Sequence, residues 1–144
     1  KLRDELNQKR REMPWEKVEQ DYSFEGPNGK ETLSQLFNSK NQLIVYHLMY
    51  SPEWDNPCSS CSYWIDQLGP TEVHLKARDT SIVVIGRAPY DKLAAGKKKL
   101  GWTVKVLSSK ESDFNYDYNV SFKGTSKEDD IKYNYKETKN NFGM

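Results

Sequence analysis

The sequence predicts one α/β domain in which a central mixed sheet is flanked by helices. Its 144 residues are 35% hydrophobic and 12% aromatic, which is enough to fill one core. Residues 42–50 and 81–87 are nearly continuous apolar runs of strand length, as expected for strands covered on both faces. A helical pattern follows each run, and a third strand is expected at 102–106. This alternation indicates parallel strand pairs joined by right-handed crossovers.

The N-terminal third adds accessory elements to this sheet. Residues 2–13 have loosely helical apolar spacing and predict a surface helix that Pro14 ends. Apolar and polar residues alternate over 18–25, which predicts a half-buried strand, and the Gly-Pro-Asn-Gly sequence at 26–29 turns the chain after it. Thr32 is expected to cap a short helix.

The run at 42–50 is expected to lie at the centre of the sheet and to be followed by a loop at 51–57. The next helix carries an apolar stripe formed by Cys61, Trp64, Ile65 and Leu68. Gly69-Pro70 is expected to kink this helix, with Val73 and Ala77 continuing its buried face. The helix after the second strand should begin at Pro89 and stop at Gly101.

Charge and hydropathy exclude several classes of function. The 22 Lys and Arg residues nearly balance the 21 Asp and Glu residues, and the net charge of +1 provides no field for a phosphate backbone. Nucleic acid is therefore not expected as a partner. The longest apolar run, 43–50, is far too short to cross a membrane. The first residues lack the apolar segment of a secretory signal, so a cytoplasmic location is expected.

The chemistry of the chain is expected at its two cysteines, Cys58 and Cys61. Two cysteines at this spacing at a helix start can close a small disulfide, and the free N–H groups and dipole there stabilise a thiolate on the first. Cys58 is therefore the expected attacking thiol. Cys61, one turn further along the apolar stripe, is the expected shielded thiol that resolves a mixed disulfide. The nearby carboxylates Glu53 and Asp55 oppose the Cys58 thiolate and reduce this effect.

A Cys-x-x-Cys pair also occurs in half of a zinc site, but its position after a buried strand and at a helix start favours redox use. A structural zinc site needs four ligands, and the chain offers two histidines, His47 and His74, beside the cysteines. For each histidine a packed or surface role is more common than ligation, so no metal and no cofactor are expected.

Four further residues are candidates for the surroundings of the cysteines. Trp54 and Asp55 lie in the loop that must border the motif. His47 is the group on the preceding strand that ionises near neutrality and could move protons, with a packed role as the alternative. Arg87 closes the second strand toward the same edge and could hold a thiolate, with an ordinary solvated arginine as the alternative.

Several motifs in order give the sequence a family resemblance from about Leu2 to Phe122. They are Pro14-Trp15, Asp21-Tyr22-Ser23-Phe24-Glu25-Gly26-Pro27, Gln42-Leu43-Ile44-Val45-Tyr46-His47, Cys58-Ser59-Ser60-Cys61-Ser62-Tyr63-Trp64, Ala77-Arg78-Asp79-Thr80, Arg87-Ala88-Pro89, Gly101-Trp102 and Ser112-Asp113-Phe114-Asn115-Tyr116. Together they are far more specific than the cysteines alone. The chain resembles the domain of unknown function 899 family, whose members are described as thioredoxin-like, predicted dithiol-disulfide oxidoreductases.

The resemblance implies a thioredoxin-like fold of the peroxiredoxin-like branch, with redox-active cysteines at Cys58 and Cys61. It supplies no substrate. Asp55 stands where peroxiredoxins carry Thr or Ser three residues before the attacking cysteine, which argues against peroxidase activity. Beyond Phe122, family members continue into further strands, a cis-proline and a last helix. Polar sequence replaces these elements here, so the fold is expected to be incomplete at its C-terminal side.

We therefore expect a thioredoxin-like domain at 1–122, with an N-terminal helix and strand extension, and a polar tail at 123–144. The alternating residues 131–135 could instead supply an edge strand, within the chain or across a homodimer. The favoured function is thiol-disulfide exchange with a protein or small-molecule disulfide. Copper or zinc handling through Cys58 and Cys61, and a binding module without turnover, are the alternatives.

Overall fold

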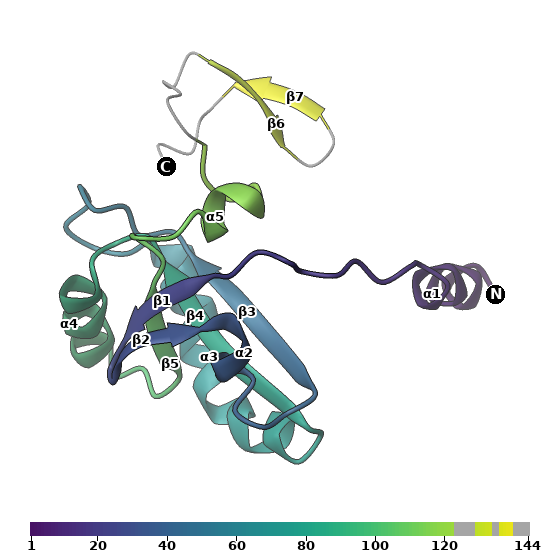
Figure 1. The fold of residues 1–144 in the computed structure, drawn as a ribbon, viewed down its shortest axis with the longest axis horizontal. Coiled ribbons are helices and arrows are strands. Elements are labelled where there is room, and N and C mark those ends of the chain that lie inside the picture. Colours follow the sequence, from purple (N-terminus) through teal and green to yellow (C-terminus); the bar gives the residue numbers. More distant parts are fainter. Residues whose placement is uncertain (123–128, 134–135, 140–144) are drawn as a thin grey trace.

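Figure 1 shows the computed structural model, which describes residues 1–122, 129–133 and 136–139. A five-stranded sheet in the order β2-β1-β5-β4-β3 forms the body of the fold. Its strands are β1 Ser23–Gly26, β2 Gly29–Thr32, β3 Gln42–Leu48, β4 Thr80–Gly86 and β5 Lys105–Ser108. Strand β4 is parallel to β3 and β5, whereas β1 is antiparallel to β5 and β2. The expected mixed sheet is therefore confirmed.

Helices cover both faces of the sheet. Helices α3 Ser59–Lys76 and α4 Tyr90–Leu100 pack on one face, and α2 Leu33–Leu36 and α5 Phe114–Asp117 pack on the other. Alternation along β4 separates the two layers, because Ile82 and Val84 belong to one core cluster and Val83 and Ile85 to the other. The α3–α4 face therefore contains the cluster that surrounds the cysteines.

The N-terminal helix is an accessory element, as the sequence predicts. Helix α1 Leu2–Arg11 has no buried residue, and Figure 1 shows it well away from the sheet at the end of an extended segment. No helix within the described ranges is long and apolar enough to span a membrane.

Strand β3 lies at the outer edge of the described sheet, which corrects the expectation that it forms the centre. Strand β4 has neighbours on both sides, and all seven of its residues are buried. Strand β3 pairs with β4 from Gln42–Thr80 to Leu48–Gly86, and within the described residues no strand pairs with its other edge. Ile44 consequently remains 42% exposed. An apolar run predicts that a strand is buried, but covering helices can bury a strand as well as neighbouring strands can. The run therefore does not show whether the strand lies at the centre or at the edge of the sheet.

Two other apolar patterns in the sequence predict more burial of side chains than the structure shows. Val18 is half exposed, and the first strand begins only at Ser23. Along α3, Cys61 and Ile65 are buried as expected, but Trp64 and Val73 are exposed because only a narrow stripe of this helix faces the sheet.

The described part of the tail forms a hairpin of its own. Strand β6 Asp130–Tyr133 pairs antiparallel with β7 Lys136–Lys139 in a separate two-stranded sheet. In Figure 1 this hairpin lies beyond α5, so these residues do not extend the five-stranded sheet. Tyr135, part of the proposed edge strand, lies outside the described residues.

Helix α4 involves two glycines with opposite structural requirements. Gly101 is its C-cap, with φ of +73° in the left-handed region, where a side chain is strained even though no atom lies within 4 Å of the position that a Cβ would take. Gly96 lies within the helix, where a Cβ would make an ordinary 3.6 Å contact with Cε1 of Tyr50.

Gly101→Ala is expected to lower the free energy of unfolding by about 1 kcal/mol, because alanine must adopt the left-handed conformation. The matched control Gly96→Ala should leave it unchanged or raise it by up to about 1 kcal/mol, since alanine is the better helix former. Urea unfolding followed by circular dichroism measures both values. Equal losses in the two variants would contradict the assigned roles.

Candidate redox site

The two cysteines lie between the end of β3 and the first turn of α3. The backbone N–H of Cys58 donates to the carbonyl of Met49 at 3.0 Å, which holds the first cysteine beside the end of the strand. Cys58 is the N-cap of α3, and Ser62 donates both its backbone N–H and its hydroxyl to the Cys58 carbonyl, each at 2.9 Å. The motif therefore starts the helix, as its spacing predicts.

The two thiols differ in exposure. Cys61 is only 7% exposed and belongs to the core cluster with Leu48 and Ile65. Cys58 is partly exposed, and the first N–H groups of an α-helix lack intrahelical acceptors. A partner can thus reach Cys58, whereas the protein shields Cys61.

The pKa of the Cys61 thiol depends on burial and on three neighbouring groups, Met49, Tyr46 and Cys58. Burial raises the pKa of the Cys61 thiol, while hydrogen bonds from the Met49 backbone N–H and the Tyr46 hydroxyl to its sulfur act in the opposite direction. The neighbouring Cys58 thiol adds to the effect of burial and raises the pKa of Cys61 further. Burial, with the hydrogen bond to Cys61, raises the pKa of Tyr46, so that its hydroxyl keeps its proton at neutral pH.

Sequence reasoning did not identify Tyr46. The alternation along β3 nevertheless carries a signal, because Tyr46 shares its face of the strand with Leu48, which α3 covers. What the sequence does not show is that the loop after β3 brings Tyr46 and Cys61 to the same cavity.

Trp54 and Asp55 both lie in the loop before Cys58, in different surroundings. Trp54 is partly buried and packs against the same core cluster as the two cysteines. Asp55 is exposed, and its backbone carbonyl accepts a hydrogen bond from the Tyr50 hydroxyl at 3.1 Å. Trp54 therefore forms part of the packing around the motif, whereas the Asp55 backbone shapes the loop.

Arg87 is oriented by an aromatic ring. Its guanidinium carbon lies 4.8 Å from the centre of the Tyr116 ring. The Ser51 hydroxyl and the backbone are the main causes of the lowered pKa of Glu53, and the charge of Arg87 adds to them. Arg87 therefore packs on Tyr116, and its positive charge favours the ionised form of the loop acid Glu53.

His47 lies on the opposite face of β3 from Tyr46. Its ring stacks on Phe114, with 5.4 Å between ring centres, and lies near Tyr118. Burial lowers the pKa of His47, so the ring is neutral at pH 7. The ring therefore packs among aromatic side chains in this structure.

The arrangement does not assemble a metal site from these histidines. His47 stacks on the face away from the cysteines, and His74 is exposed in the last turn of α3. Within the part of the chain that the structure describes, no three His, Cys, Asp or Glu side chains gather closely enough to hold a metal ion.

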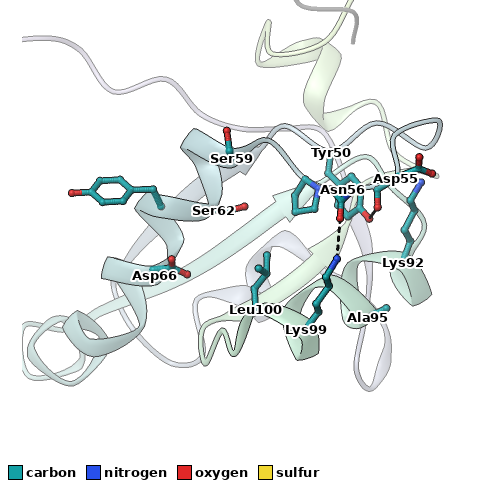
Figure 2. A pocket seen from close by; sticks show the side chains of 13 residues that line it. Tyr50, Asp55, Asn56, Ser59, Ser62, Asp66, Lys92, Ala95, Lys99 and Leu100 are labelled. Atoms are coloured by element: carbon teal, nitrogen blue, oxygen red, sulfur yellow. Dashed lines mark hydrogen bonds between the residues drawn. The ribbon is translucent and has the colours of Figure 1, made fainter.

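Two cavities border the motif. One, of about 570 Å³, lies between the start of α3 and helix α4, and Figure 2 shows Lys99 reaching across it to the Asn56 side chain, at 3.1 Å. The residues around Cys58 that line it are Pro57, Ser59 and Ser62. The other, of about 260 Å³, is lined by Tyr46 and Cys61 together with residues of β6 and the segment after α5. The larger cavity thus adjoins the backbone around Cys58, and the smaller one contains the Cys61 side chain.

Solved structures with the same fold place the chain among thioredoxin-like proteins. A PrxQ mutant from Xylella fastidiosa matches with a TM-score of 0.56 and 17% identity, over 72% of this chain and 62% of that one. A structure described as thiol:disulfide interchange protein DsbE from Chlorobium tepidum matches with a TM-score of 0.53 and 15% identity, over 72% of this chain and 69% of that one. The chain thus spans less than two thirds of the PrxQ chain. At these identities the comparisons show the fold, which is thioredoxin-like as predicted.

Sequence comparison identifies the family. No curated protein matches the chain. The model of a family described as "Bacterial protein of unknown function (DUF899)" matches residues 1–144, and so extends beyond Phe122, where the resemblance was expected to end. The chain belongs to the DUF899 family of bacterial proteins.

Proposed function

We propose that the protein is a thiol-disulfide oxidoreductase that uses Cys58 and Cys61 as a reversible redox pair. The observation that carries this proposal is the placement of both cysteines at the start of α3, with Cys58 as the N-cap and Cys61 in the first turn. Two cysteines three residues apart at a helix start can form a disulfide with little movement of the backbone. The thioredoxin-like fold supports the proposal, because it is shared with a protein described as a thiol:disulfide interchange protein.

The exposure of the two thiols supports a division of roles. The Cys58 thiolate attacks a partner disulfide, forming a mixed disulfide and releasing one partner sulfur as a thiolate. The Cys61 thiolate then attacks the Cys58 sulfur, closing the Cys58–Cys61 disulfide and releasing the second partner sulfur. Two electrons pass from the cysteine pair to the partner, and the same steps in reverse oxidise a partner dithiol.

The proposed partner is a protein or small-molecule thiol or disulfide in the cytoplasm, where dithiols are kept reduced. The cavity in Figure 2 adjoins Cys58, and its volume of about 570 Å³ suits a small molecule or a peptide side chain. Tyr50 and Leu100 offer apolar walls, and the Asn56 amide offers a polar group. Metal handling is the weaker alternative because the His47 ring stacks on Phe114 and His74 is exposed in the last turn of α3.

Redox titration tests the proposed function. In mixtures of reduced and oxidised glutathione, both thiols should disappear together into an internal disulfide, with a potential within roughly −270 to −120 mV. Thiol counting and mass spectrometry follow the reaction, and Cys58→Ser or Cys61→Ser should abolish the internal disulfide. Thiols that stay reduced at every ratio, or that are protected by copper or zinc in the purified protein, would rule the proposal out.

Alkylation at pH 7 distinguishes the two thiols. Iodoacetamide should label Cys58 faster than Cys61, because Cys58 is accessible while burial both shields Cys61 and raises its pKa. Labelling of Cys61 should accelerate as the pH rises, since the reactive species is the thiolate. Peptide mapping after short reaction times measures both rates. Equal rates, or faster labelling of Cys61, would reverse the assignment.

Removal of the resolving thiol should trap partners. Cys61→Ser is expected to accumulate mixed disulfides through Cys58, because nothing then releases the bound partner. The matched control is Cys58→Ser, which keeps the shielded thiol and should trap little. Non-reducing gels of each variant mixed with a model protein disulfide show the adducts. Equal trapping by both variants would mean that either cysteine can attack.

A further inference from the structure

Tyr46 reaches the redox pair from the edge strand of the described sheet. It lies on β3 and packs against the cluster that contains Cys61 and Ile65, and its hydroxyl is one of the groups that act to lower the pKa of the Cys61 thiol. Tyr46 and Cys61 also line the same cavity of about 260 Å³. Tyr46 therefore borders the same space as the sulfur that must become a nucleophile in the second step of the proposed reaction.

A buried resolving thiol presents a chemical problem. Its thiolate has to form where charge is poorly solvated, and burial is the largest effect on the Cys61 thiol. A hydrogen-bond donor to the sulfur offsets this effect, because it interacts more strongly with the thiolate than with the neutral thiol. The donor must itself stay protonated, as the Tyr46 hydroxyl does.

Resting on the proposed function, we propose that Tyr46 is a catalytic residue that stabilises the Cys61 thiolate while the mixed disulfide on Cys58 is resolved. As the Cys61–Cys58 bond forms, the bond between Cys58 and the partner sulfur breaks, and its electron pair leaves with the partner. The proton lost by Cys61 passes through solvent to that departing thiolate. Tyr46 supplies a hydrogen bond throughout and gives up no proton.

A comparison of the groups around Cys61 favours Tyr46 as the residue that stabilises its thiolate. From α3, Cys58 faces the sulfur, and a charge on Cys58 would oppose a thiolate on Cys61. From the loop after β3, the Met49 backbone N–H donates to it. From β6, Tyr133 lines the shared cavity. His47 lines that cavity too, but its ring stacks on Phe114 on the other face of β3. Of the two groups that act to lower the pKa of Cys61, Tyr46 contributes the side-chain hydroxyl.

Stopped-flow reaction of the reduced protein with Ellman's reagent separates the two steps. The first release of thionitrobenzoate reports attack by Cys58 and depends on reagent concentration. The second reports attack by Cys61 within the protein and is independent of concentration. Tyr46→Phe should leave the first phase unchanged and slow the second about tenfold at pH 7, which is the scale of one hydrogen bond to a charged group. It should also move the pH midpoint of the second phase upward by about one unit.

Tyr22→Phe is the matched control. It removes the hydroxyl of a buried tyrosine, which donates to Asp117 at 2.8 Å on the opposite face of the sheet, and should alter neither phase. If Tyr46→Phe does not fold, 3-fluorotyrosine placed at position 46 alone keeps the ring and strengthens the donor, and should move the midpoint downward.

The outcomes are distinguishable. A second phase that is identical in Tyr46→Phe, the fluorotyrosine protein and the unmodified protein would overturn the role of Tyr46 and leave the proposed function intact. The absence of a second phase in the unmodified protein would overturn both. Equal slowing in Tyr22→Phe and Tyr46→Phe would show a general effect of stability and would also overturn the role of Tyr46.

Discussion

The parallel pairing of β3 with β4 is the constraint on which the site depends. Strand β4 is buried along its whole length and fixes β3 at seven consecutive positions. The connection from the end of β3 must then return across the sheet to the start of β4, and α3 makes that return. This geometry places the first turn of α3 beside Met49, where a backbone hydrogen bond holds Cys58 and the core packing holds Cys61.

The sequence predicts features that depend on local pattern and leaves open those that depend on long-range pairing. The strands around Val45 and Val83, the helix start at Cys58 and the helix end at Gly101 were all readable from spacing and residue type. The place of β3 at the edge was not, because it depends on which strands pair rather than on the composition of β3. Tyr46 was not predicted as a site residue for a related reason, because its position near Cys61 depends on the path of the intervening loop.

The surroundings of the sulfurs consist largely of neutral dipoles. A backbone N–H and a phenol act to lower the pKa of Cys61, while Cys58 lies at the N-terminus of an eighteen-residue helix. Charged side chains near the motif have other partners: the Lys99 ammonium donates to Asn56, and Arg87 stacks on Tyr116. The balance between thiol and thiolate at Cys61 is therefore set mainly by burial and hydrogen bonding, which ionic strength affects little.

The proposed reacting sulfurs and their donors all lie between Tyr46 and Cys61 in the sequence. Bringing together groups so close along the chain costs little loop-closure entropy, whereas β1 must meet β5 from the far end of the domain. Once β3 has docked on β4 and α3 has packed over them, the site needs no contact from the N-terminal hairpin. Assembly of the redox pair is thus a local folding event that can precede completion of the sheet.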